Sequence, residues 1–186
     1  MDKKIRPDIS NALIHLTGDR TCSGRLSAEQ ALHSILREGI IHGSGNDGFI
    51  KGTQHAVCFT EMPLGSIKYY INDNHGSKHK YDYFGIALPK TAAWEAGARP
   101  VIYLPDNEAH WIPNKEKWRH VQFKLRDIDF THEREWRLMG DLDLSKFNFY
   151  VIVPNKEHEN KILKIDSPVA KKIIGFLHMH YLNDLL

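Results

Sequence analysis

Two glutamates in the segment at 131–137 have a spacing that suits chemistry. Glu133 and Glu135 are separated by one residue, so on an extended strand both carboxylates face the same way. One member of such a pair could hold a sugar hydroxyl while the other orients a nucleophile. The alternative is a solvated edge strand, on which Arg134 and Arg137 are cross-strand partners of the glutamates.

A second polar pair lies near the start of the chain. Residues 12–17 read as a strand, and alternation places His15 and Thr17 on one face with Ile14 and Leu16 on the other. A polar pair facing a cleft could hydrogen-bond a ribose or an amide. The alternative is that both side chains face solvent on a half-buried strand.

A third candidate site combines the end of a strand with nearby tyrosines. Residues 55–60 are β-branched or aromatic enough to predict a strand, which would deliver Thr60 and Glu61 to its end. Tyr81 and Tyr83 follow, and an aromatic ring there could stack on a nicotinamide or a base. Alternatively, these tyrosines lie at the edge of the core.

Other kinds of site find less support. His178 and His180 would share a strand face, but no Asp, Glu or Cys has a companion spacing, so we expect no metal. Cys58 lies in an apolar strand, which favours packing over a reactive thiolate. The HExxH, GxGxxG, P-loop and GxSxG motifs are absent, which argues against zinc proteases, Rossmann dehydrogenases, P-loop NTPases and α/β-hydrolases.

Composition describes an ordinary globular chain. Its 186 residues, 41% hydrophobic and 26% charged, predict a single domain over residues 1–186. Lys plus Arg number 25 and Asp plus Glu 23, a net charge of +2 that is too small for a non-specific nucleic-acid coat. The polar N-terminus, the absence of a long apolar run and only two cysteines predict a cytoplasmic protein without a membrane partner.

The elements that must position these residues mix helices and strands. Ser27 and Gln30 form a capping-box pattern that opens a helix, and Gly39 ends it. Because helices come early and strands cluster late, the pattern predicts an α+β fold. We expect further strands at 83–88, 100–104, 135–139, 147–153 and 173–177, short helices at 63–71 and 90–96, and loops at 40–52, 72–80 and 105–118.

The order of these pieces resembles the ADP-ribosyltransferase fold. The segments ALHSILREGII, CFTEMPL, YFGIALPK, GARPVIYL and EREWRL are similar to DarT-like enzymes and to abortive-infection phage-defence proteins of the AbiG type, over about residues 11–153. The resemblance implies small, twisted, mostly antiparallel sheets with early helices. It also implies an enzyme that uses NAD as a substrate without a metal and modifies DNA, RNA or protein. Such an enzyme would be a toxin or an anti-phage defence effector, with a cognate antitoxin or toxin as its partner.

The resemblance also implies roles for individual residues. Glu135 would bind the 2′-hydroxyl of the nicotinamide ribose and Glu133 would orient the acceptor. Cleavage of the nicotinamide–ribose bond develops oxocarbenium character, which a nearby carboxylate stabilises. The remaining assignments all concern NAD binding: His15 on the adenosine ribose with Thr17 close by, Thr60 at its strand end, Tyr83 stacked on nicotinamide, and Arg20 or Arg25 on the pyrophosphate.

The chain departs from these families at one strand. Where the arginine-specific class has Ser-Thr-Ser, this chain has a strand that ends Cys58-Phe59-Thr60-Glu61, and Glu61 and Met62 stand where DarT enzymes place an arginine. These departures leave open a non-catalytic module, an antitoxin or sensor, that binds a nucleotide or a partner. A third hypothesis is a metal-independent nuclease that uses His15, His120 and His132 as acid and base.

Overall fold

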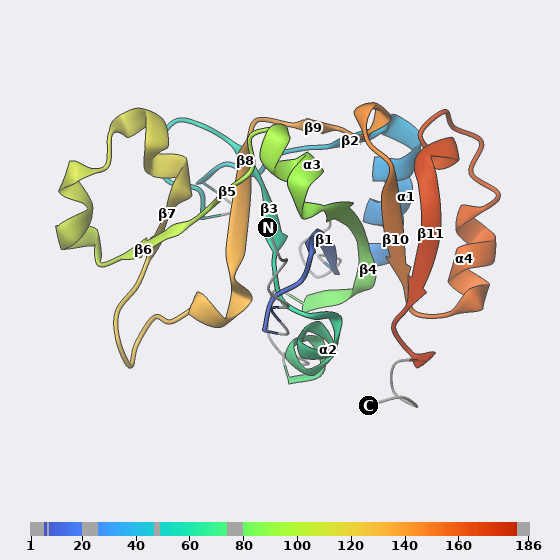
Figure 1. Ribbon diagram of the computed structural model, residues 1–186, viewed down its shortest axis with the longest axis horizontal. Coiled ribbons are helices and arrows are strands. Elements are labelled where there is room, and N and C mark those ends of the chain that lie inside the picture. The colour runs from blue at the N-terminus through green and yellow to red at the C-terminus, as the bar shows by residue number, and fades with distance from the viewer. Residues whose placement is uncertain (1–5, 7, 20–25, 47–48, 74–79, 182–186) are drawn as a thin grey trace.

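The protein is built around one seven-stranded, mostly antiparallel sheet (Figure 1). The structure, a computed structural model, describes residues 6, 8–19, 26–46, 49–73 and 80–181. The strand order is β11-β10-β4-β1-β3-β8-β5, and every neighbouring pair is antiparallel except β10 and β11. The strands of this sheet are β1 (Ala12–Asp19), β3 (Ala56–Thr60), β4 (Lys80–Pro89), β5 (Arg99–Pro100), β8 (Glu135–Met139), β10 (Phe149–Val153) and β11 (Ile173–His178). The expected α+β class with mostly antiparallel strands is therefore confirmed.

Two small sheets extend the molecule. Strands β2 (Ile40–Ile41) and β9 (Leu142–Asp143) pair antiparallel, while β6 (Ile102–Leu104) and β7 (His120–Gln122) pair parallel. The single strand expected at 100–104 is wrong: β5 pairs with β8 in the main sheet, and β6 leaves it to pair with β7. The expected loop at 105–118 contains two 3-10 helices, Asp106–Trp111 and Asn114–Arg119.

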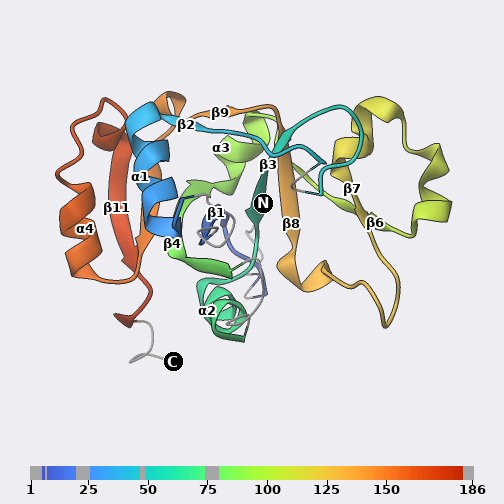
Figure 2. The ribbon, with the colours of Figure 1, turned by 180° about the vertical axis from the view of Figure 1, so that it is seen from behind.

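Helices cover both faces of the main sheet. Three helices, α1 (Ala28–Glu38), α3 (Lys90–Glu95) and α4 (Lys156–Ile162), contribute to the larger core, whereas α2 (Leu64–Asp73) packs on the smaller core. Figure 1 places α1 behind β10, and the view from behind in Figure 2 brings it to the front. Helix α4 was not anticipated, although Asn155 caps it by accepting the N–H groups of Glu157 and His158.

Local sequence signals explain how β1 and α1 sit on this sheet. Leu13 faces the larger core and Ile14 and Leu16 face the smaller one, as alternation along β1 predicts. The capping box at the start of α1 is present in both directions: the Ser27 N–H donates to the Gln30 side chain at 3.0 Å, and the Gln30 N–H donates to the Ser27 hydroxyl at 3.2 Å.

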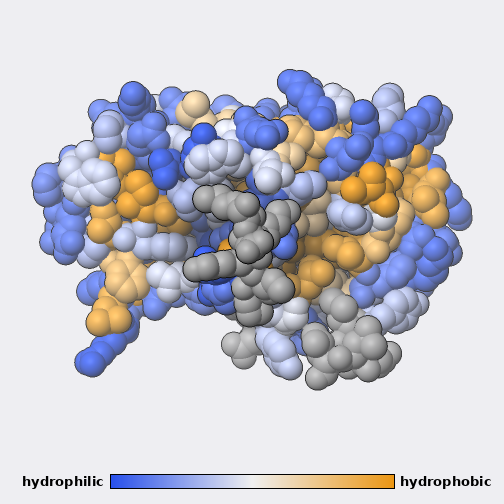
Figure 3. Space-filling view, in the orientation of Figure 1, coloured by the Kyte–Doolittle hydropathy of each residue, from blue (hydrophilic) through white to orange (hydrophobic). Residues whose placement is uncertain are grey.

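The surface is polar over most of the face in Figure 1. Apolar side chains gather in small patches, on the left over β6 and β7 and on the right towards β10 and β11 (Figure 3). Within the described ranges, none of the helices has the length and apolar character needed to cross a membrane.

Candidate functional site

The candidate site is organised around the first residue of β8. Glu135 lies opposite Thr60, the last residue of β3. Its carboxylate accepts two hydrogen bonds from Arg137, from Nε at 2.7 Å and from Nη2 at 3.2 Å. An arginine fork occupies only part of the lone-pair capacity of a carboxylate. Glu135 is therefore held in one orientation and can still accept a hydroxyl.

Glu133 lies in the turn that precedes β8, close to Glu135. It ends a 3-10 helix at Thr131–Glu133, and Arg134 follows with a left-handed φ of 47° before β8 begins. The expectation that this stretch is extended is therefore wrong. A non-glycine residue in this conformation costs about 1–2 kcal/mol, and such strain is concentrated at functional sites.

The carboxyl of Glu133 has a different environment from that of Glu135. Tyr70 on α2 donates a hydrogen bond to Glu133 Oε1 at 2.6 Å, and the Thr60 hydroxyl donates to the Glu133 carbonyl at 2.5 Å. Burial raises the pKa of Glu133, and the nearby charge of Glu135 raises it further. A carboxyl with a raised pKa is suited to exchanging protons closer to neutral pH.

Aromatic side chains pack around Tyr70, which contacts Glu133. The Tyr70 ring centroid lies 5.5 Å from that of His132 and 6.1 Å from that of Tyr81. Tyr83, the expected stacking residue, is only 9% exposed, and its hydroxyl donates to the side-chain oxygen of Asn72 at 2.8 Å. Tyr81, at 37% exposed, is therefore the better-placed ring of the two for contact with a ligand.

Tyr103 on β6 fixes the backbone at the start of β8. Its hydroxyl accepts the N–H of Glu135 at 3.2 Å and lies 3.1 Å from the carbonyl of Phe130, to which it donates. Burial raises the pKa of Tyr103 to about 12, so the hydroxyl keeps its proton and remains a donor. Sequence reasoning missed Tyr70 and Tyr103, because both come from distant elements and neither has a distinctive local pattern.

The structure does not bring His15 together with Glu135. Ile14 pairs with Thr60 and Thr60 pairs with Glu135, so these three side chains emerge on one face of the sheet. His15 emerges on the other, where its Nδ1 donates to the Cys58 carbonyl at 2.8 Å and its ring packs edge-on against Phe59. The expectation that both residues contact one dinucleotide is therefore not supported.

Thr17 is also part of the core packing. It is 4% exposed, and its hydroxyl lies 2.8 Å from the Ala28 carbonyl and 3.1 Å from the Phe84 carbonyl. These contacts engage its O–H and join β1 to α1 and β4, and the side chain is buried in the core. Arg20 and Arg25 lie outside the described residues.

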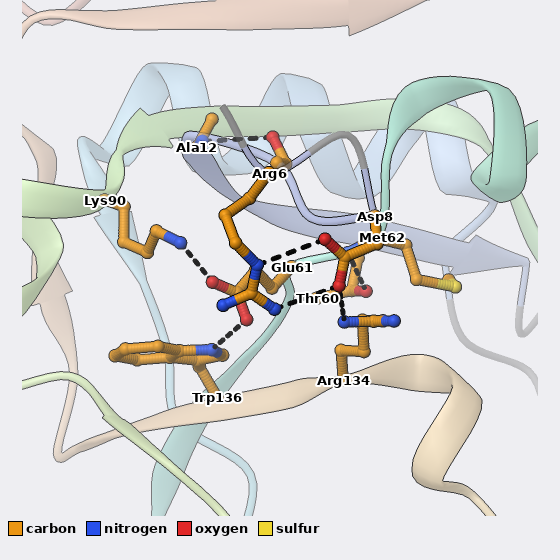
Figure 4. Close-up of polar contacts among 10 residues, drawn as sticks. Arg6, Asp8, Ala12, Thr60, Glu61, Met62, Lys90, Arg134 and Trp136 are labelled. Carbon is orange, nitrogen blue, oxygen red and sulfur yellow. Dashed lines mark hydrogen bonds and ion pairs between the residues drawn. The ribbon is translucent and has the colours of Figure 1, made fainter. Parts of the chain in front are cut away.

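Glu61 and Met62, which follow Thr60 at the end of β3, have structural partners (Figure 4). Glu61 forms an ion pair with Lys90 and accepts the indole N–H of Trp136 at 3.2 Å. Met62 is 5% exposed in the smaller core, and its N–H donates to the Thr60 hydroxyl at 3.1 Å. In the same view, the left-handed Arg134 forms an ion pair with Asp8 at 3.3 Å.

A shallow groove of about 490 Å³ lies apart from the carboxylate pair. Trp136 follows Glu135 in β8, so its side chain points to the opposite face of the sheet, where it forms one wall of the groove. The Trp94 ring lies edge-on to the Trp136 ring, with 6.2 Å between the ring centroids. The groove is lined by Asn11, Lys90, Thr91, Trp94, Glu95 and Trp136.

His178, His180 and His120 have separate partners and do not form a common centre. His178 Nε2 lies 2.7 Å from Glu159 Oε2, whereas His180 packs against the ring of Tyr83. His120 is 4% exposed, and its Nε2 donates to the Leu104 carbonyl at 2.9 Å. In the part of the chain that the structure describes, no three His, Cys, Asp or Glu side chains are placed to hold a metal ion.

Comparison of the chain with protein-family models, with curated proteins and with solved structures finds no match in any of the three. The side chains around Glu133 and Glu135 are therefore the observations from which a function can be inferred.

Proposed function

We propose that this chain is an NAD-dependent ADP-ribosyltransferase that modifies a macromolecule, either nucleic acid or protein, as a toxin or an anti-phage defence effector. The observation that carries the proposal is the carboxylate pair at the start of β8. Glu135 is held by the Arg137 guanidinium, whereas Glu133 is half-buried beside the Tyr70 hydroxyl with a raised pKa. Two carboxylates in such different environments can take different roles in one reaction.

The proposed reaction divides the work between the two glutamates. The bond between ribose C1′ and the nicotinamide nitrogen breaks, and nicotinamide leaves as a neutral molecule with both electrons of that bond. The carboxylate of Glu135 stabilises the oxocarbenium character that develops on the ribose. Glu133 accepts the proton of the acceptor hydroxyl or amine, whose oxygen or nitrogen then bonds to C1′. A base with a raised pKa is better matched to this transfer at neutral pH.

Nicotinamide release from NAD tests the proposal directly. Glu135→Gln and Glu133→Gln should each abolish release or reduce it by about 10²-fold or more. The matched control is Glu108→Gln, an exposed glutamate of the 3-10 helix at Asp106–Trp111, which should leave release unchanged. Mass spectrometry of cellular nucleic acid and protein after expression should find an added ADP-ribose. Absence of release by the unmodified chain, or full release by both site variants, would contradict the proposal.

A second candidate is a binding module without catalysis. The observation that favours it is the ion pair of Glu135 with Arg137, which gives that carboxylate a structural role independent of catalysis. Calorimetry with NAD separates the two candidates when it is combined with the release measurement. Binding without nicotinamide release supports the module, and release supports the enzyme.

A further inference from the structure

We propose that Tyr70 is a positioning residue, which orients the carboxyl of Glu133 through a hydrogen bond to its Oε1. This inference rests on the proposed function, because it gives Glu133 the role of base towards the acceptor. Neither the spacing of the glutamates nor the family resemblance points to Tyr70.

The position of Tyr70 follows from how α2 is anchored. Ile67 and Ile71 of this helix are 0% and 2% exposed in the smaller core, so the helix cannot shift without disturbing that packing. The Tyr70 ring is flanked by His132 and Tyr81. These contacts restrict the ring, so its hydroxyl remains aimed at Glu133 Oε1, 2.6 Å away.

Glu133 is also restrained through its own backbone. Its N–H donates to the Phe130 carbonyl at 3.0 Å, and its carbonyl accepts from the Thr60 hydroxyl. These bonds fix the main chain, whereas Tyr70 acts on the carboxyl itself. The hydrogen bond from Tyr70 therefore selects among the side-chain orientations that the fixed backbone still allows.

The charges that face Glu133 define what the Tyr70 bond does. They come from Glu135 and Arg137 on β8 and from His132 in the preceding turn. Burial raises the pKa of Glu133, and the hydrogen bond from Tyr70 lowers it by stabilising the charged form. Burial and Glu133 itself raise the pKa of the Tyr70 hydroxyl, so this group stays protonated and donates. Tyr70 thereby favours the carboxylate, which is the form that can act as a base.

Tyr70→Phe removes the hydroxyl and keeps the ring, and Tyr69→Phe is its matched control. Tyr69 is the adjacent residue on α2 and is 66% exposed. Two measurements apply to both variants: carboxyl NMR titration of Glu133 in the free protein, and the pH dependence of kcat for nicotinamide release. We expect Tyr70→Phe to raise the titration midpoint of Glu133, to move the rising limb of the kcat profile to higher pH and to lower kcat on that limb by up to about tenfold. Tyr69→Phe should change neither quantity.

The outcomes separate the role of Tyr70 from the proposed function. If the protein releases nicotinamide but Tyr70→Phe leaves the titration or the pH profile of kcat unmoved, the role of Tyr70 is overturned and the enzyme stands. If the unmodified protein releases no nicotinamide, the proposed function fails, and the catalytic role of Tyr70 fails with it even where the titration moves. A uniform loss of kcat without a shift of the profile would indicate a structural role only.

Discussion

The carboxylate of Glu135 and the guanidinium of Arg137 form a two-bond ion pair inside the protein. Their side chains are only 12% and 3% exposed. Arg137 is bound further by the carbonyl of Trp118 at 2.7 Å, so the guanidinium cannot turn towards solvent if its partner is lost. Glu135 therefore has a structural role as well as the proposed chemical one, and a substitution there affects both.

We expect Glu135→Gln to destabilise the fold in addition to abolishing NAD turnover. A buried charge without its partner costs about 3–5 kcal/mol, so the free energy of unfolding in denaturant should fall by about that amount at pH 7. Asp127→Asn is the control, because its ion pair with Lys124 lies between side chains that are 55% and 66% exposed. That variant should lie within about 1 kcal/mol of the unmodified protein. Equal stability of Glu135→Gln and the control would show that the buried pair contributes little.

Gly85 in β4 allows β1 and β4 to lie close together. A Cβ atom added there would lie 2.4 Å from the backbone carbonyl oxygen of His15, which cannot move without shifting β1. We expect Gly85→Ala to lower the free energy of unfolding by about 1–3 kcal/mol or more. The matched control is Gly175→Ala in β11, where the nearest atoms belong to the Tyr150 side chain at 3.2 Å and can move aside. A similar loss in both variants would contradict this reason.

Two histidines should give pH dependences of opposite sign. Burial lowers the pKa of His33 in α1, and its Nε2 is buried without a hydrogen-bond partner among the described residues. Below about pH 6.5 His33 therefore binds a proton more readily in the unfolded chain than in the folded protein, and the free energy of unfolding falls as pH falls. Hydrogen bonds to Asp141 and Glu38 raise the pKa of His42. The stability that protonated His42 contributes is fully present below about pH 6.5 and is lost as pH rises through the raised pKa of His42 in the folded protein.

The measurement compares free energies of unfolding at pH 5 and pH 8. The free energy of unfolding of His33→Gln should fall less between pH 8 and pH 5 than that of the unmodified protein. Any deficit in stability of this variant at pH 8 should therefore shrink or reverse at pH 5. His42→Gln should show its larger deficit at pH 5 and little deficit at pH 8. The effect of His42 should be the smaller one and should fall with added salt, because its side chain is 62% exposed. The same sign in both variants would contradict the assignment.

Local signals predicted some elements, such as α1 and β1, whereas non-local pairing determined the others and the site. The capping box at Ser27 and the alternation in β1 depend on neighbouring residues, so both could be predicted from sequence. The end of one strand at Pro100 and the start of another at Ile102 depend on which strands pair there, which no local pattern states.

The same limit applies within the site. The spacing of Glu133 and Glu135 predicted that their carboxyls lie near each other, and they do, although the extended geometry behind that expectation was wrong. The two faces of β1 were predicted correctly. Which of them lies on the same side of the sheet as Glu135 is set by the register of β1 with β3 and of β3 with β8. Tyr70 reaches Glu133 across 63 residues of chain, a contact that only the folded structure shows.

Thr60 offers a test between the role that its sequence predicts and the one that its contacts indicate. As a residue that binds NAD, it would affect KM, and Thr60→Val would raise KM with kcat nearly unchanged. Its hydroxyl instead donates to the Glu133 carbonyl and accepts the Met62 N–H, so the substitution should misplace Glu133. We therefore expect kcat for nicotinamide release to fall about tenfold with little change in KM, together with a loss of about 1–3 kcal/mol in the free energy of unfolding.

Thr91→Val in α3 is the control for this substitution, because Thr91 is exposed and lies in the groove apart from the carboxylate pair. It should leave kcat, KM and stability close to those of the unmodified protein. A rise in KM alone for Thr60→Val would return Thr60 to the NAD-binding role. Because Glu133 is held through its carbonyl by Thr60 and through its carboxyl by Tyr70, Thr60→Val combined with Tyr70→Phe should lower kcat by less than the product of the two single effects.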